Sequence, residues 1–127
     1  MIHGIGTDIV AIERLRLLHA RYGERLAQRL LAGEEQTDYH AAADKVRLLA
    51  KRFAAKEALA KALGTGLRPP VSLAHIAVAH DALGRPSFRF ATPLAEWLAA
   101  RGVGRVHLTL ADERDYAVGF VVAERSS

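Results

Sequence analysis

The residues best suited to chemistry lie between Arg52 and Gly66, in the run RFAAKEALAKALGTG, where one acid stands between two lysines ahead of a glycine pair. At about 100° per residue, Glu57 falls near the middle of an apolar helical stripe rather than on a charged rim. That stripe consists of Val46, Leu49, Ala50, Phe53 and Ala60. An unpaired charge taken out of water costs many kcal/mol. The pattern therefore predicts a metal ion, a basic group or an open cleft at Glu57.

Asp8 is a second acid in an apolar setting, within the run GIGTDIV. One interpretation makes Asp8 the N-cap of the following helix, because aspartate accepts hydrogen bonds from free helix amides. The other makes it a metal ligand. Two carboxylates from separate elements, without Cys or His at ligand spacing, suit an oxygen-loving ion such as Mg²⁺. The residues alone leave both interpretations open, and the six scattered histidines are each more typical of structural or exposed positions.

Lys61 follows Glu57 by four residues, the spacing of a helix-surface ion pair worth about 0.2 to 0.5 kcal/mol. The segment 64–66, Gly-Thr-Gly, comes next. Its glycines allow the backbone to approach an anion beyond the helix end, beside the lysine. The same segment is also typical of a simple helix terminator. It does not fit the P-loop pattern, and residues 4–6 do not fit the dinucleotide-binding pattern.

The elements that must position these residues follow the order strand, helices, two strands, helix, two strands. Segment 2–10 is rich in Ile, Val and Gly, which predicts a strand buried on both faces. A long central helix, capped by Asp44, is expected to stop at Gly64. The remaining elements are an amphipathic helix on Ile12, Leu15, Leu18 and Tyr22, helices over 26–31 and 34–40, a helix that Thr92 caps and that lasts until Gly102, and strands over 76–80, 87–90, 106–111 and 116–123. The order predicts one α+β domain over 1–127, with a mostly antiparallel sheet packed on the central helix.

Composition narrows the class of protein. The chain has 127 residues, half of them hydrophobic, and no cysteine, which excludes disulfide scaffolds and thiolate metal sites. Its net charge is +4, with 14 arginines against 4 lysines. Arginine suits phosphate and carboxylate, so an anionic partner is expected: nucleic acid, a nucleotide cofactor or an acidic protein. No signal peptide or membrane-spanning run is evident, which favours a soluble cytoplasmic protein without membrane contact.

Two motifs together resemble those of the holo-acyl-carrier-protein synthases, the short class of 4'-phosphopantetheinyl transferases. They are GIGTDIV at residues 4–10 and the run at 52–66, and they occur in the expected order and at the expected separation. The resemblance covers the whole chain. It implies transfer of 4'-phosphopantetheine from coenzyme A to a serine of apo acyl carrier protein, releasing adenosine 3',5'-bisphosphate. It also implies Mg²⁺, a cytoplasmic role in fatty-acid synthesis, and a homotrimer with active sites at the subunit interfaces.

The same resemblance implies roles for individual residues. Asp8 and Glu57 match the magnesium ligands, and Lys61 matches the lysine near the coenzyme A phosphates. Arg52, Gly64, Thr65, Gly66, His107 and Thr109 match positions around the nucleotide. Arg14 and Arg21 match the basic face that meets an acidic carrier helix, and Arg25 approximates a third such position with the register shifted by one. The segment from His107 to Asp112 departs from the common His-x-Ser-x-Ser/Thr-His pattern at Thr109, Ala111 and Asp112, so this chain has no second histidine there.

These roles imply phosphoryl-type transfer in which Mg²⁺, held by Asp8 and Glu57, bridges the pyrophosphate while Lys61 adds positive charge. The serine proton would pass to Glu57, to Asp8 or to metal-bound water, with Glu57 preferred. Two alternatives stay open. A small nucleic-acid-binding domain would use the same arginine excess, although the aromatic residues are mostly placed as core. A broad-specificity transferase for polyketide or peptide carriers is closer, although such relatives are typically much longer.

Overall fold

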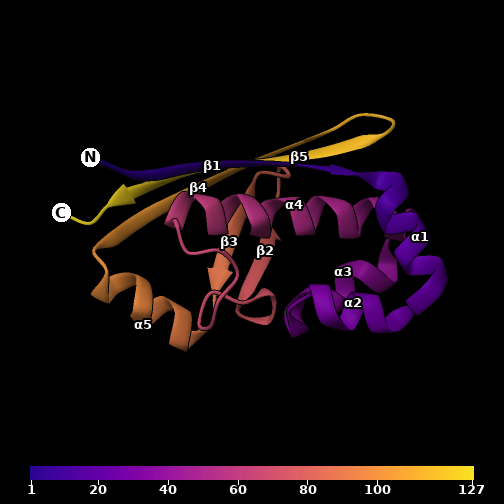
Figure 1. Ribbon diagram of the computed structural model, residues 1–127, viewed down its shortest axis with the longest axis horizontal. Coiled ribbons are helices and arrows are strands. Elements are labelled where there is room, and N and C mark those ends of the chain that lie inside the picture. The colour runs from indigo at the N-terminus through magenta and orange to yellow at the C-terminus, as the bar shows by residue number, and fades with distance from the viewer.

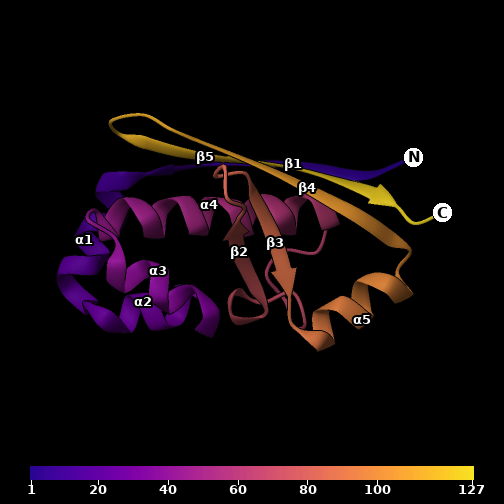
Figure 2. The same cartoon turned by 180° about the vertical axis from the view of Figure 1, so that it is seen from behind.

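The computed structural model describes residues 1–127 and is built around one long helix, α4 (Lys45–Leu63). A three-stranded antiparallel sheet lies along α4, in the order β1 (Ile2–Ala11), β5 (Tyr116–Arg125), β4 (Val103–Asp112). The other elements are α1 (Ile12–Tyr22), α2 (Glu24–Leu30), α3 (Gln36–Ala41), β2 (Ile76–His80), β3 (Pro86–Phe90), α5 (Thr92–Ala100) and short 3-10 turns at Gly33–Glu35 and Leu73–His75. Helices α1 and α5 lie at opposite ends of α4 (Figures 1 and 2). The predicted fold class, α+β with a mostly antiparallel sheet on a long central helix, is confirmed.

Most predicted elements are present, and the differences lie at their ends. Asp44 caps α4 as expected, since its Oδ1 accepts a hydrogen bond from the Arg47 backbone amide at 3.0 Å. The prediction that Thr92 caps α5 is wrong, because Ala91 occupies the cap position and makes no side-chain cap, and α5 ends at Ala100 rather than at Gly102. Strands β4 and β5 are longer than predicted. No helix is long and apolar enough to span a lipid bilayer.

The sheet and α4 approach so closely that only glycine fits at their contact points. A Cβ atom at Gly4 would lie 2.0 Å from the carbonyl oxygen of Ala62, and one at Gly6 would lie 2.1 Å from that of Ala58. Gly119 on β5 is similarly close to the α4 backbone, at 2.7 Å. Such distances leave no room for a side chain. The glycines therefore fix β1 directly against α4, and this contact determines how far apart functional groups on the two elements lie.

The outer face of the sheet is uncovered, so the prediction that segment 2–10 is buried on both faces is wrong for the single chain. Ile5 and Ile9 of β1 are 62% and 64% exposed, and Phe120 of β5 is 41% exposed. Side chains alternate along a strand, so the glycines of β1 face α4 while the isoleucines face outward. The result is an exposed apolar surface, a feature that usually marks an interaction site.

A buried ionic cluster fixes the opposite side of α4. Glu35 is 1% exposed and Lys56 is 0% exposed. The Glu35 carboxylate accepts hydrogen bonds from the Lys56 ammonium, from the Arg52 guanidinium, from a backbone amide in the turn before α3 and from another in β2. Burial lowers the pKa of Lys56, while the negative charge of Glu35 opposes that change. Glu35 therefore joins α4 to two other elements through a single side chain.

Replacing Glu35 with alanine should lower the free energy of unfolding by about 3 to 5 kcal/mol, because buried Lys56 would lose its only carboxylate partner and Arg52 one of its two. Urea denaturation followed by circular dichroism measures the change. Glu34→Ala is the matched control: its carboxylate is half exposed and 3.7 Å from Arg89, so the loss should stay below about 1 kcal/mol. Equal, small losses in both variants would contradict this prediction.

Candidate active site

Asp8 lies in the middle of β1, opposite Gly119 of β5, and not at a helix terminus. The N-cap position of α1 is held by Ala11, which makes no side-chain cap. The structure therefore excludes the N-cap interpretation of Asp8. Its side chain lies beside α4 and is only 17% exposed. A partly buried carboxylate in a strand, next to a helix, is available to bind a cation.

Lys61 of α4 contacts β1. Its ammonium donates to Asp8 Oδ1 at 3.1 Å and to the backbone carbonyl oxygen of Thr7 at 3.0 Å. Strand β1 is at the edge of the sheet, so a carbonyl on its open side is free to accept such a bond. The alternative of a simple Glu57–Lys61 surface pair is therefore not what forms. Lys61 remains 56% exposed, which leaves its charge accessible to a ligand.

Glu57 lies on the same flank of α4, one turn before Lys61, and is partly buried. Burial raises the pKa of Glu57, the nearby Asp8 carboxylate raises it further, and Lys61 and Arg14 oppose these effects. Two neighbouring carboxylates repel each other, and a divalent cation between them would relieve that repulsion. No group of three His, Asp or Glu side chains is positioned to hold a metal. A pair of carboxylates suits Mg²⁺, which usually takes one or two protein carboxylates and completes its shell with water and substrate phosphates.

The predicted phosphate-binding turn, residues 64–66, follows the C-terminal end of α4. α4 ends at Gly64 with φ of 75°, and Gly66 has φ of 67°, a region that favours glycine. The Thr65 hydroxyl donates to the Gly66 carbonyl oxygen at 2.8 Å. A Cβ atom at Gly64 or Gly66 would meet no atom within 4 Å, so the turn is open to solvent. Asp8, Glu57 and Lys61 thus lie on the β1 side of α4, and the turn begins three residues after Lys61.

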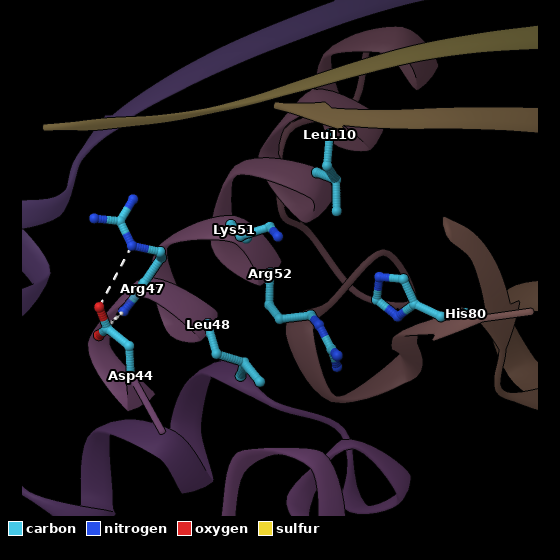
Figure 3. A pocket seen from close by; sticks show the side chains of 7 residues that line it. All are labelled: Asp44, Arg47, Leu48, Lys51, Arg52, His80 and Leu110. Atoms are coloured by element: carbon cyan, nitrogen blue, oxygen red, sulfur yellow. Dashed lines mark hydrogen bonds and ion pairs between the residues drawn. The ribbon is translucent and has the colours of Figure 1, made fainter. Parts of the chain in front are cut away.

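Arg52 lies on a different flank of α4, since five residues from Arg52 to Glu57 rotate the direction by about 140°. Its guanidinium bonds Glu35 Oε2 at 3.0 Å and Asp38 Oδ2 at 3.1 Å. It borders a cavity of about 260 Å³ (Figure 3). The lining residues are Asp44, Arg47, Leu48, Lys51, Arg52, His80 and Leu110. The pKa of His80 is lowered by burial and then by Arg52 and Lys51, as expected in a positively charged cavity.

The sequence reasoning did not single out Arg47, Lys51 or His80 as cavity residues. The available signal was the spacing of Arg47, Lys51 and Arg52, which places three cations within two turns of one helix. Two of these charges are already compensated, because Asp112 pairs with Arg47 at 3.0 Å and with Lys51 at 3.5 Å. An acid at the end of β4 therefore holds both cations at the cavity.

His107 and Thr109 are on β4, which forms the other edge of the sheet from β1. They alternate with the inward-facing Leu108 and Leu110 and so lie on the outer face. His107 Nε2 bonds the Glu124 carboxylate of β5 there. Since α4 lies under the opposite face, the single chain does not bring His107 and Thr109 to Glu57. Asp8, Glu57 and Lys61 thus lie on the β1 side of α4, whereas His107 and Thr109 lie on the outer face of β4.

The three predicted docking arginines are exposed on the helices at one end of α4. Arg14 and Arg21 belong to α1, and Arg25 belongs to α2. The guanidinium carbons of Arg21 and Arg25 lie 5.2 and 5.8 Å from the centre of the Tyr22 ring. A groove of about 460 Å³ runs between the two helices, lined by Leu18, Tyr22, Arg25, Leu26, Arg29 and Leu30. This end of the molecule therefore combines an apolar groove with free positive charge.

A strand carboxylate, a helix carboxylate, a lysine and an open glycine turn lie near one another on this fold, an arrangement suited to a divalent cation and a phosphate. The chain belongs to the 4'-phosphopantetheinyl transferase superfamily, whose family model matches residues 4–121. It is 54% identical to the holo-[acyl-carrier-protein] synthase of Laribacter hongkongensis over 98% of this chain and 99% of that protein. The resemblance to holo-acyl-carrier-protein synthases is confirmed.

Two solved structures extend the comparison. The holo-[acyl-carrier-protein] synthase of Neisseria meningitidis aligns with a TM-score of 0.96 and 49% identity over 98% of this chain and all of that one. The Bacillus anthracis holo-(acyl-carrier-protein) synthase, solved in complex with CoA (3',5'-ADP), aligns with a TM-score of 0.81 and 32% identity, covering 100% of this chain and 99% of that one. The fold described above is therefore shared with enzymes of this type along essentially its full length.

Proposed function

We propose that this protein transfers 4'-phosphopantetheine from coenzyme A to a serine of apo acyl carrier protein, giving the holo carrier and adenosine 3',5'-bisphosphate, in the cytoplasm and for fatty-acid synthesis. The observation that carries the proposal is the meeting of Asp8, Glu57 and Lys61 beside the open turn at 64–66. The family membership and the names of the relatives support the same reaction.

Asp8 and Glu57 are proposed to hold Mg²⁺, which fits their like-charge repulsion and the absence of a third acidic or histidine ligand. When bound, the ion would neutralise charge on the pyrophosphate of coenzyme A. Lys61 would release Asp8 and place its exposed ammonium against the same phosphates. The turn after α4 leaves its backbone open to the anion beyond Lys61, so three features of this chain act on one pyrophosphate.

The chemical step is an in-line displacement at phosphorus. The serine oxygen of the carrier forms a bond to the phosphorus that bears pantetheine, and the bond from that phosphorus to the bridging oxygen breaks. The electron pair leaves with adenosine 3',5'-bisphosphate. Glu57 is the proposed acceptor of the serine proton, because it is the carboxylate of this site that makes no ion pair. Asp8, as the other proposed ligand of the ion, would orient the site rather than take the proton.

The second group of residues is proposed to bind the nucleotide, with two copies of the chain completing one site. Arg52 borders a positively charged cavity. His107 and Thr109 lie on the outer face of β4, an edge strand of the sheet. Because the sheet separates His107 and Thr109 from Glu57, a neighbouring subunit would have to supply those two residues, whereas Arg52 lies on the same helix as Glu57. The exposed apolar surface of Ile5, Ile9 and Phe120 supports such an assembly, which we propose to be a homotrimer with interfacial active sites.

Mass spectrometry of the carrier tests the activity directly. Purified apo acyl carrier protein is incubated with this protein, coenzyme A and Mg²⁺, and the intact mass of the carrier is measured. The expected result is a gain of one phosphopantetheine, which disappears with EDTA. No gain on any member of a panel of fatty-acid, polyketide and peptide carriers would contradict the proposal.

Arg14→Glu should raise the carrier KM by about tenfold and leave the coenzyme A KM within about twofold, because Arg14 is exposed near Glu57 and would meet the acidic carrier. Steady-state kinetics with each substrate varied in turn separate the two constants. Arg16→Glu is the control on the same helix, where Arg16 faces away and pairs with Glu13. Equal effects on both KM values would remove the docking role of Arg14.

A further inference from the structure

A second arginine surface lies at the other end of α4. A cavity of about 290 Å³ is lined by Gly64, Thr65, Arg68, Pro69, Trp97 and Arg101, and no acidic residue takes part. Neither Arg68 nor Arg101 belongs to any of the ion pairs of the protein, and both are exposed. The cavity in Figure 3 differs, because Asp44 and Asp112 offset its cations. The surface at Arg68 and Arg101 therefore keeps two adjacent arginines without a counter-charge, as the groove at Arg25 and Arg29 does near α1.

Arg101 is held in place before any partner arrives. Its guanidinium carbon lies 4.5 Å from the centre of the Trp97 ring, at the C-terminal end of α5. A guanidinium stacked on an indole ring is attracted to it and loses side-chain freedom. A partner that binds Arg101 therefore orders less of this side chain on association than it would with a free arginine. The stacked arginine is suited to planar anions, of which the carboxylate is the commonest in proteins.

The position of this surface relates it to the proposed reaction. Gly64 lies three residues after Lys61, which corresponds to about 4.5 Å along the helix axis. Arg14, Arg21 and Arg25 belong to α1 and α2, and α5 lies at the opposite end of α4 from α1 (Figures 1 and 2). Arg68 and Arg101 line their cavity together with Trp97 of α5. A serine placed beside Asp8, Glu57 and Lys61 would thus have arginines on both sides.

We propose that Arg68 and Arg101 form a second docking surface, which binds acidic side chains of the carrier protein on the side of the target serine away from α1. This inference rests on the proposed function. The negative charges of coenzyme A already have candidate partners in Lys61, the turn at 64–66 and the cavity beside Arg52. Arg68 and Arg101 are exposed to solvent rather than enclosed, which fits contact with a protein surface.

Steady-state kinetics of Arg68→Glu, Arg101→Glu and the double variant test the surface. The double variant should raise the carrier KM by about tenfold, change the coenzyme A KM by less than about twofold, and flatten the salt dependence of the carrier KM. Arg101→Lys keeps the charge but not the planar, stacked guanidinium, so its carrier KM should lie between those of Arg101→Glu and the wild type. Arg89→Glu is the matched control, since Arg89 is an exposed arginine of β3 with one loose ion pair. Thermal melts confirm that all variants are folded.

A carrier scan identifies the contact. Each Asp or Glu near the target serine is changed to Lys in turn, and at least one such carrier should be modified better by the double variant than by the wild-type protein. A rise in the coenzyme A KM without a rise in the carrier KM would overturn the proposal in favour of a co-substrate site. Unchanged constants would also overturn it.

The wild-type protein, measured in the same assay, separates failure of this surface from failure of the proposed function. If wild-type protein modifies no carrier, the proposed function falls, and equilibrium binding of apo acyl carrier protein to both proteins then decides the surface. Binding about tenfold weaker for the Arg68→Glu/Arg101→Glu variant supports the docking surface. Equal binding, or none by the wild type, overturns it.

Discussion

Replacing Glu57 with glutamine should reduce transfer to acyl carrier protein by about 10³-fold or more, because one side chain carries two roles. It is one of only two carboxylates beside Lys61, and it is the proposed base for the serine proton. Loss of proton transfer alone costs about 10² to 10⁴ in rate. Glutamine keeps the size of the side chain but binds neither a cation nor a proton in the same way. Initial rates from the mass of the carrier measure the loss.

The stability of the same variant distinguishes a chemical effect from unfolding. The pKa of Glu57 is raised in the folded chain, so the folded state binds the proton more tightly than the unfolded state does. Stability from this group therefore falls as pH rises through the ordinary range of a glutamate carboxyl. Glutamine lacks that charge, and metal-free Glu57→Gln should be no less stable than the wild type at neutral pH. A rate within about tenfold of the wild type, with magnesium dependence kept, would contradict the assignment.

Glu96→Gln provides the matched control for this substitution. Glu96 is exposed on α5 and takes part in no ion pair. Its replacement makes the same chemical change on the surface, away from Asp8 and Lys61. The transfer rate should stay within about twofold of the wild type, and a large loss there would show that glutamate-to-glutamine changes act through the overall charge.

Local signals in the sequence were enough to predict the elements that carry the site. Asp44 and Gly64 mark the ends of α4 because capping and a positive φ depend on a single residue and its near neighbours. The meeting of Asp8 with Lys61 depends instead on a contact between β1 and α4. Gly4 and Gly6 make that contact possible. A sequence shows two glycines, but which helix they will pack against follows only from the assembled fold.

The buried charges could not be predicted for a related reason. Glu35 and its partners Arg52 and Lys56 are separated by 17 and 21 residues, so no helical or strand period relates them. Resemblance placed Arg52 near the nucleotide, and the structure adds that Glu35 and Asp38 already hold its guanidinium. The prediction for segment 2–10 failed because Ile, Val and Gly give the same pattern whether an apolar face meets a core or stays uncovered. In the single chain, the outward-facing Ile5 and Ile9 are not covered by any other element.

Mixing two inactive variants, Glu57→Gln and His107→Ala, should restore activity if neighbouring copies complete each site. Glu57 lies beside β1 on the face of the sheet that packs on α4, whereas His107 lies on the outer face of β4. Each variant alone should lose at least about tenfold. In a closed ring, each site combines Glu57 of one copy with His107 of the next. In every three-membered ring that contains both variants, one site of the three has both residues intact, so the doubly tagged assembly should show about a third of wild-type activity.

The control for this experiment mixes Glu57→Gln with Asp8→Ala. Both residues lie on the same flank of α4 and belong to the same half of the site. Every site in such a mixture therefore lacks one carboxylate, and no activity should return, however the copies exchange. The two mixtures are prepared alike, by co-expression with different tags and isolation of the doubly tagged assembly. Recovery in neither mixture would show that His107 acts within its own chain or has no part in the reaction, whereas recovery in both would place Asp8 and Glu57 on different subunits.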